Sequence, residues 1–141
     1  MHDIDDYPQA RQVPGLVVYR YDAPLCFINA DDFARRALAA AQAADPPAEW
    51  LLLNAEANVD VDITAVDALD ELHRQLDDIG VVLALARVKH ELHDTLTAAG
   101  FVDRVGEDRI FMTLPTAVQA YLTEYTERHG SPPPDYPGPP T

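Results

Sequence analysis

Apolar residues along the chain follow two spacings, which predict strands that alternate with helices. Short, nearly continuous apolar runs are typical of strands inside a sheet, and four occur here: GLVVYRY, LCFIN, EWLLLNAEA and VVLALAR. Elsewhere, apolar residues recur every three or four positions, which predicts one face of a helix: Ala65, Leu69, Leu72, Leu76 and Ile79. We expect this helix to run from about Thr64 to Asp78, with Gly80 as its stop.

Three more helices and a further strand are expected from the same kind of evidence. ADDFARRALAAAQAAD has an apolar face, can be capped by Asp31 or Asp32, and is followed by Pro46 and Pro47. VKHELHDTLTAAG predicts a helix closed by its final glycine, and PTAVQAYLTEYTERHG predicts a last helix with proline in its first turn. RIFMTL, between these two, predicts a short strand.

The resulting order is β-β-α-β-α-β-α-β-α, which places the chain in the α/β class. The first two strands are separated by DAP, a turn signal, and predict an antiparallel hairpin. Later strands alternate with helices, which implies parallel pairing through right-handed crossovers. We therefore expect one domain over residues 13–130, with a mixed, mostly parallel sheet of about five strands and about four helices. Residues 1–12 are expected to be a linker, and the proline-rich residues 131–141 a disordered tail.

Composition narrows the classes of function. The 141 residues carry a formal net charge of −14, which repels phosphate backbones and argues against nucleic-acid binding. The apolar runs are far shorter than the roughly 20 residues of a membrane-spanning helix, so the chain is not expected to span a membrane itself. The single Cys26 lies in an apolar stretch and is expected to be an inert buried thiol.

Motifs for catalysis and metal binding are missing from the sequence. Neither GxGxxG nor GxxxxGK[ST] nor GxSxG occurs. His90, Glu91 and His93 imitate part of a zinc motif, but the two histidines are spaced i, i+3 rather than i, i+4 and no third ligand follows. We expect a solvated helix face there, no metal site and no enzyme activity.

The stretch NVDVDITAVDALDEL places Asp60, Asp62 and Asp67 around Thr64 at the start of a helix. Thr64 can be an ordinary helix cap, with Asp67 in a variant capping box. It can also be a switch that a kinase or a ligand reaches, because open α/β sheets place their sites at the carboxyl ends of the strands. The two interpretations are compatible.

Two motifs give the chain a family resemblance. A strand is followed by D-x-[ST]-[GA] at Asp62–Ala65, then a helix, a strand, and a helix that ends in Gly100 and Phe101. Over roughly residues 13–129 this pattern resembles a STAS domain, the module shared by SulP-type sulfate permeases and bacterial anti-sigma factor antagonists. The N-terminal piece is similar to the segment that joins the membrane part of bacterial SulP permeases to this domain, at Pro14, Gly15, Tyr19, Arg20, Ala23, Pro24, Leu25, Phe27, Asn29 and Ala30.

The resemblance implies a non-catalytic regulatory domain on the cytoplasmic face of the cell membrane, as part of an anion transporter. Residues 1–12 would link it to the transmembrane domain of the same permease, its expected partner, and regulatory proteins could be others. The expected interaction site is the loop and helix start with Asp60, Asp62, Ile63, Ala65 and Asp67. No clustered arginines offer a site for sulfate itself.

Two alternatives remain open for Thr64. In antagonist relatives the hydroxyl residue of this motif is phosphorylated, although here threonine stands for the usual serine and Ala65 for the usual glycine. Some STAS relatives bind guanine nucleotides, and Thr64, Arg87 and Lys89 are the candidates for weak GTP or GDP binding, with a dissociation constant on the order of 10⁻⁴ to 10⁻³ M. No other cofactor is expected.

Overall fold

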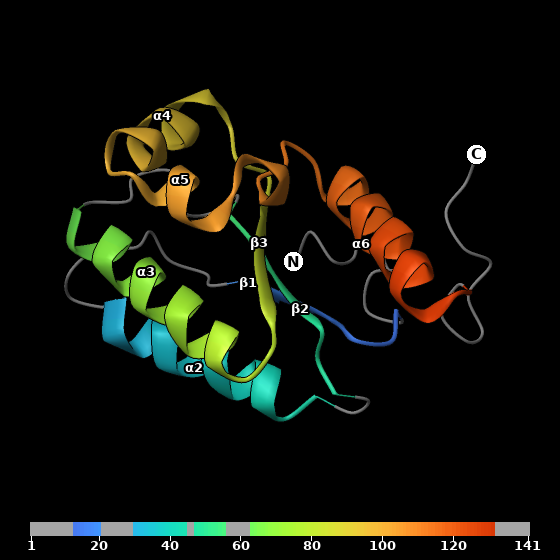
Figure 1. The fold of residues 1–141 in the computed structure, drawn as a ribbon. Coiled ribbons are helices and arrows are strands. Elements are labelled where there is room, and N and C mark those ends of the chain that lie inside the picture. Colours follow the sequence, from blue (N-terminus) through green and yellow to red (C-terminus); the bar gives the residue numbers. More distant parts are fainter. Residues whose placement is uncertain (1–12, 21–29, 45–46, 56–62, 132–141) are drawn as a thin grey trace.

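A computed structural model describes residues 13–20, 30–44, 47–55 and 63–131, which fold around a parallel sheet with the strand order β1-β2-β3 (Figure 1). In chain order the elements are β1 (Leu16–Arg20), α2 (Ala30–Gln42), β2 (Trp50–Asn54), α3 (Ile63–Asp78), β3 (Val82–Ala86), α4 (His90–Ala98), α5 (Phe101–Val105), the 3-10 helix η2 (Glu107–Arg109) and α6 (Leu114–His129). Within the described residues no helix is both long and apolar enough to cross a membrane.

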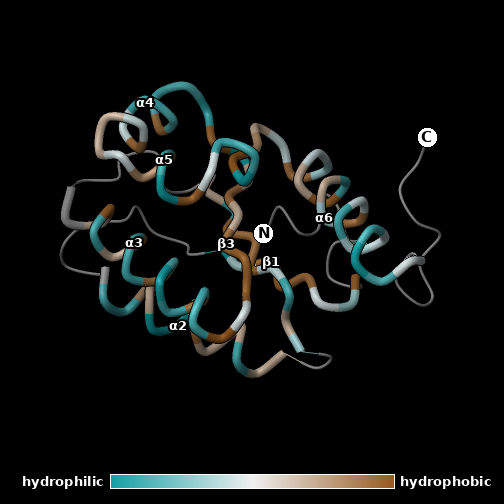
Figure 2. The backbone as a smooth tube through the Cα atoms, viewed as in Figure 1, coloured by the Kyte–Doolittle hydropathy of each residue, from teal (hydrophilic) through white to brown (hydrophobic). Residues whose placement is uncertain are grey.

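Both faces of the sheet are covered, which explains why its central strand is apolar throughout. All five residues of β2 are buried. Alternate side chains point to opposite faces. Leu51 and Leu53 join a core with α2, α3, α4 and α5, whereas Trp50 and Leu52 join a second core with α6. The strands lie between these two layers and form the apolar centre of the molecule (Figures 1 and 2).

The apolar stripe predicted for the second helix is confirmed, except at its last position. Ala65, Leu69, Leu72 and Leu76 are all buried on α3. Ile79 is 47% exposed, so its assignment to this stripe was wrong. The helix ends at Asp78, and Gly80 then takes a φ of +78° that turns the chain toward β3.

The predicted N-terminal hairpin is tested only in its first strand. β1 forms, but it pairs in parallel with β2, in register from Leu16 opposite Trp50 to Arg20 opposite Asn54. The return strand LCFIN lies outside the described residues. Helix α2 begins at Ala30, so Asp31 and Asp32 stand in its first turn rather than at the cap.

The strand predicted for RIFMTL was wrong. Its first residue, Arg109, ends η2, and only Ile110 makes a bridge, with Leu85 of β3. Thr113 then caps α6 by accepting a hydrogen bond from the backbone N–H of Thr116 (3.1 Å), which ends the extended segment after a few residues. Pro115 lies in the first turn of α6, as predicted.

A short helix, α5, was not predicted. Gly100 closes α4 with a φ of +80°, and Phe101 and Val102 are then buried in the larger core. Arg104 of α5 donates hydrogen bonds to both carboxylate oxygens of Asp70 on α3 (2.8 and 2.6 Å). The α/β class and the parallel sheet are confirmed. The described residues contain three strands and five α-helices, where about five strands and four helices were expected.

Candidate functional site

The carboxyl ends of the three strands lie at one edge of the sheet and bring polar side chains together. Arg20 ends β1 opposite Asn54, which ends β2, and Asn54 is opposite Ala86 at the end of β3. Arg87 follows with a φ of +61°, and it is the non-glycine residue of the described chain that takes a positive φ. Asn54 is fully buried. Ligand sites of parallel α/β sheets lie at such edges.

Only part of the predicted switch site can be placed. Asp60 and Asp62 lie outside the described residues. Thr64 stands in the first turn of α3, which begins at Ile63, whereas a capping role for Thr64 would require the helix to begin at Ala65. Ala65 is buried and Asp67 is exposed. Within this predicted interaction site, the surface that the structure describes therefore consists of the backbone at the start of α3 and the side chain of Asp67.

The two predicted cations behave differently. Arg87 is partly buried at the sheet edge, whereas Lys89 is exposed at the N-cap of α4 and makes no ion pair with a described residue. Arg20 and Asn54 were missed as site residues. The signal that could have found them is a polar residue at the last position of an otherwise apolar strand, because parallel strands end at the same edge.

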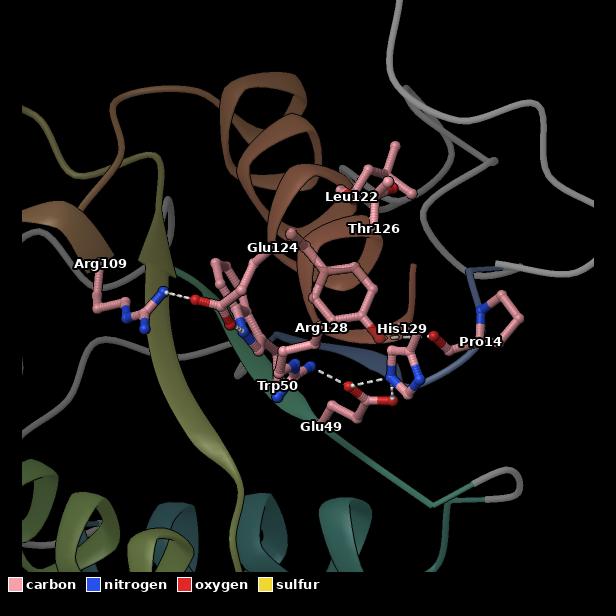
Figure 3. A network of polar contacts seen from close by, with 10 residues as sticks. Pro14, Glu49, Trp50, Arg109, Leu122, Glu124, Thr126, Arg128 and His129 are labelled. Atoms are coloured by element: carbon pink, nitrogen blue, oxygen red, sulfur yellow. Dashed lines mark hydrogen bonds and ion pairs between the residues drawn. The ribbon is translucent and has the colours of Figure 1, made fainter. Parts of the chain in front are cut away.

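On the face of the sheet that packs against α6, a network of polar contacts around Trp50 attaches this helix (Figure 3). Glu124 accepts hydrogen bonds from Trp50 Nε1 (2.8 Å) and from Arg109 Nη1 (3.0 Å). The Arg109 guanidinium also lies over the Trp50 ring, 5.0 Å from its centroid. Burial by itself would raise the pKa of Glu124, but the hydrogen bonds from Trp50 and Arg109 outweigh it and leave this pKa below its ordinary value.

A second set of contacts attaches α6 to Pro14, which precedes β1, and to Glu49, which precedes β2. Tyr121 donates a hydrogen bond from its hydroxyl to the backbone oxygen of Pro14 (2.6 Å). Glu49 forms ion pairs with Arg128 and His129 (Figure 3). Burial, with a smaller effect from Glu49, raises the pKa of Tyr121, so this hydroxyl stays protonated as a donor.

A pocket of about 200 Å³ lies between α4, η2 and the segment that leads to α6. Its lining is mainly apolar and comprises Val88, His90, His93, Glu107, Ile110, Phe111 and Met112. His93 Nε2 lies 2.9 Å from Glu107 Oε2, and this contact joins α4 to η2. In the described ranges, no three histidine, cysteine or acidic side chains converge as a metal site, and His90, Glu91 and His93 form none.

Comparison with known proteins places this fold in a family. A family model described as the STAS domain matches residues 7–117. "Probable sulfate transporter Rv1739c" of Mycobacterium tuberculosis is 64% identical over 121 residues, which are 86% of this chain and 22% of that protein. "Low affinity sulfate transporter 3" of Stylosanthes hamata is 33% identical over 131 residues, 86% of this chain and 20% of that protein.

Solved structures agree on the fold. The SulP transporter STAS domain of Vibrio cholerae superposes with a TM-score of 0.70 at 24% identity, over 89% of this chain and 99% of that one. The chain spans about a fifth of the length of the curated relatives above. On this evidence, the chain belongs to the STAS domain family.

Proposed function

We propose that this chain is the non-catalytic regulatory and interaction domain of a sulfate or related anion transporter, at the cytoplasmic face of the membrane. The observation that carries the proposal is the 64% identity to a sulfate transporter of Mycobacterium tuberculosis over 86% of the chain. Because the matched region is only 22% of that relative, the remainder of such a transporter would hold the anion pathway. The domain would act on it through surface contacts.

The net charge of the chain supports an interaction role. With a formal charge of −14, the domain would be attracted to basic segments and repelled by anionic lipid and free sulfate. Cytoplasmic loops of membrane proteins carry an excess of Lys and Arg. The transmembrane domain of the same permease is therefore the partner that the charge favours.

Sulfate uptake tests this proposal. Cells that lack their own sulfate uptake would express the transporter with and without the domain, at equal amounts in the membrane. We expect removal of the domain to change the initial rate of uptake while the protein stays in the membrane. An unchanged rate, at equal abundance, would show that the domain does not regulate transport.

A second function, weak guanine-nucleotide binding, has one observation in its favour. Arg20, Asn54 and Arg87 gather at the carboxyl edge of the sheet, from which the chain continues toward the start of α3. Cationic side chains near a helix N-terminus can favour phosphate. Asp67 on α3 opposes it, so any affinity is expected to stay in the range of about 10⁻⁴ to 10⁻³ M.

An amide-resolved NMR titration with GTP and GDP, with and without Mg²⁺, tests the nucleotide proposal. We expect shifts confined to Arg20, Asn54 and residues 60–67 and 87–89. Silence at millimolar nucleotide would exclude this ligand and leave protein contacts as the means of regulation. Phosphorylation of Thr64, as in a free anti-sigma factor antagonist, stays a prediction, which partner affinity of a Thr64→Glu variant would test.

A further inference from the structure

An exposed apolar side chain extends the pocket between α4 and η2 outward. Met112 and Ile79 are the two large apolar residues that the structure shows exposed in the described ranges, at 61% and 47%. Met112 lines the pocket, whereas Ile79 is not among its lining residues. Methionine is flexible and polarisable, and it is frequent at surfaces that bind apolar side chains of varied shape. The pocket, with Met112 at its edge, is therefore a mainly apolar surface from which a bound side chain would displace water.

Backbone contacts hold the floor of this pocket in place. Phe111 donates its N–H to the oxygen of Leu85 in β3 (2.8 Å), and Val88 donates its N–H to the oxygen of Phe111 (3.0 Å). The pair between His93 and Glu107 closes one wall. The pocket is therefore formed before any ligand arrives, and a preformed site loses less conformational entropy on binding.

The charge at the rim selects among occupants. Glu107 and Asp108 of η2 are exposed, and Asp94 is exposed one helical turn beyond His90 on α4. Two positive charges oppose these three carboxylates: Lys89, and Arg109 of η2, which is already paired with Glu124. The rim is therefore net negative. A second copy of this chain would bring the same negative rim, and nucleic acid or anionic lipid would be repelled. A segment with Lys or Arg beside an apolar residue is complementary.

We propose that the pocket between α4 and η2 receives an apolar side chain from a Lys/Arg-rich cytoplasmic loop of the transporter's own membrane domain. The proposal rests on the function proposed above and names the surface through which that function is exerted. Cytoplasmic loops are rich in Lys and Arg, so their charge matches the rim. The matched residues make up only 22% and 20% of two sulfate transporters that this chain resembles, and the unmatched part is large enough to contain such loops.

Short peptides test the chemistry of the surface without reference to transport. The 15N-labelled chain would be titrated with Ac-Lys-Lys-Leu-Lys-Lys-amide, with a serine analogue in place of leucine, and with an analogue in which glutamate replaces every lysine. We expect the leucine peptide to shift amides of residues 88–93 and 107–112, the serine analogue to bind about tenfold more weakly because less apolar area is buried, and the acidic peptide to leave them unchanged. Equal binding of the leucine and serine peptides, or no shifts at the pocket, would overturn the proposal.

Matched variants test the surface in the transporter. Met112→Asp places a charge at the mouth of the pocket, and Ile79→Asp makes the same change at the other exposed apolar residue. Asp94→Lys reverses a rim charge, and Glu127→Lys, exposed on α6, is its control. We expect Met112→Asp and Asp94→Lys to reproduce the effect of removing the domain on uptake, and the two controls to behave like the unaltered protein.

The outcomes separate the two proposals. If removal of the domain changes uptake but Met112→Asp behaves like Ile79→Asp, the domain regulates transport through another surface and the pocket proposal fails alone. If removal of the domain changes nothing, the function proposed above fails, and the peptide titration still decides whether the pocket binds basic apolar segments.

Discussion

Replacing Glu124 with alanine should weaken the attachment of α6 to the sheet. The change removes the acceptor for Trp50 Nε1, and Trp50 is fully buried, so its N–H loses its partner away from water. A buried donor left without a partner costs about 1–3 kcal/mol. The lost ion pair with Arg109, whose two side chains are 25% and 27% exposed, adds about 0–1 kcal/mol. We expect the free energy of unfolding to fall by about 1–4 kcal/mol.

Urea unfolding followed by tryptophan fluorescence measures this effect directly, because Trp50 is the only tryptophan of the chain. With a slope of about 2 kcal/mol per M, the urea midpoint should fall by about 0.5–2 M. Glu124→Gln keeps an acceptor for Trp50 and should cost less than Glu124→Ala. Glu127→Ala, an exposed position on the same helix, should stay within about 0.5 kcal/mol of the unaltered chain.

The same carboxylate predicts a pH dependence. The pKa of Glu124 is lower in the folded chain than its ordinary value of 4.5, so the ionised form stabilises the fold. This contribution is complete above pH 4.5 and is lost as the pH falls through the lowered pKa. The difference in stability between the unaltered chain and Glu124→Gln should therefore narrow in acid. Equal midpoints for Glu124→Ala and Glu127→Ala, or a difference that does not change with pH, would refute this role of Glu124.

Three further changes test the packing around α6 and α3. Gly15→Ala should cost about 2–3 kcal/mol, because φ is +83° and a Cβ would clash with the Tyr121 hydroxyl. Gly130→Ala, at a φ of +81° with open space around it, should cost about 1 kcal/mol in the same urea assay. Tyr121→Phe should cost about 0.5–1.5 kcal/mol at neutral pH, because the hydrogen bond to Pro14 is lost. Since folding raises the pKa of Tyr121, the stability advantage of tyrosine over phenylalanine should shrink as the pH rises above 10, and thermal unfolding would measure this. Leu76→Ala should cost about 2–5 kcal/mol by cavity formation, and a calorimetric loss below 1 kcal/mol would contradict the packing of α3.

Sequence periodicity predicted the elements that pack against the sheet, because burial on one face imposes a pattern. Leu69, Leu72 and Leu76 could be assigned to the core from spacing alone. Ile79 continued the spacing but lies beyond the last helical residue, where Gly80 turns the chain. The period of a pattern does not say where the backbone leaves the helix.

The RIFMTL segment shows a second limit. Its apolar residues are compatible with a strand, but a strand also needs a partner for several residues, and only Ile110 bridges β3. The capping of α6 by Thr113 competes for the same residues. Such competition depends on tertiary contacts that spacing does not contain.

The sequence predicted which kinds of residue form the candidate site better than it predicted where those residues lie in the fold. Arg87 could be placed at the carboxyl edge because it follows a predicted strand. Arg20 and Asn54 could be placed beside it only from the register between β1, β2 and β3, which the structure shows. The pocket beside α4 is lined by η2 and by the segment after it, and no periodicity predicted η2. Short elements of a few residues carry too little pattern to be recognised before the fold is known.

Direct binding between this chain and the transporter's membrane domain tests the central claim. The membrane domain, prepared without its STAS domain in nanodiscs, would be added to the 15N-labelled chain while amide signals are followed. The account predicts a saturable loss of amide signal that begins at the acidic rim of the pocket around Met112. This loss should weaken as salt rises, because salt screens the attraction between opposite charges. Unchanged spectra at low salt, with a membrane domain shown to be folded, would contradict it.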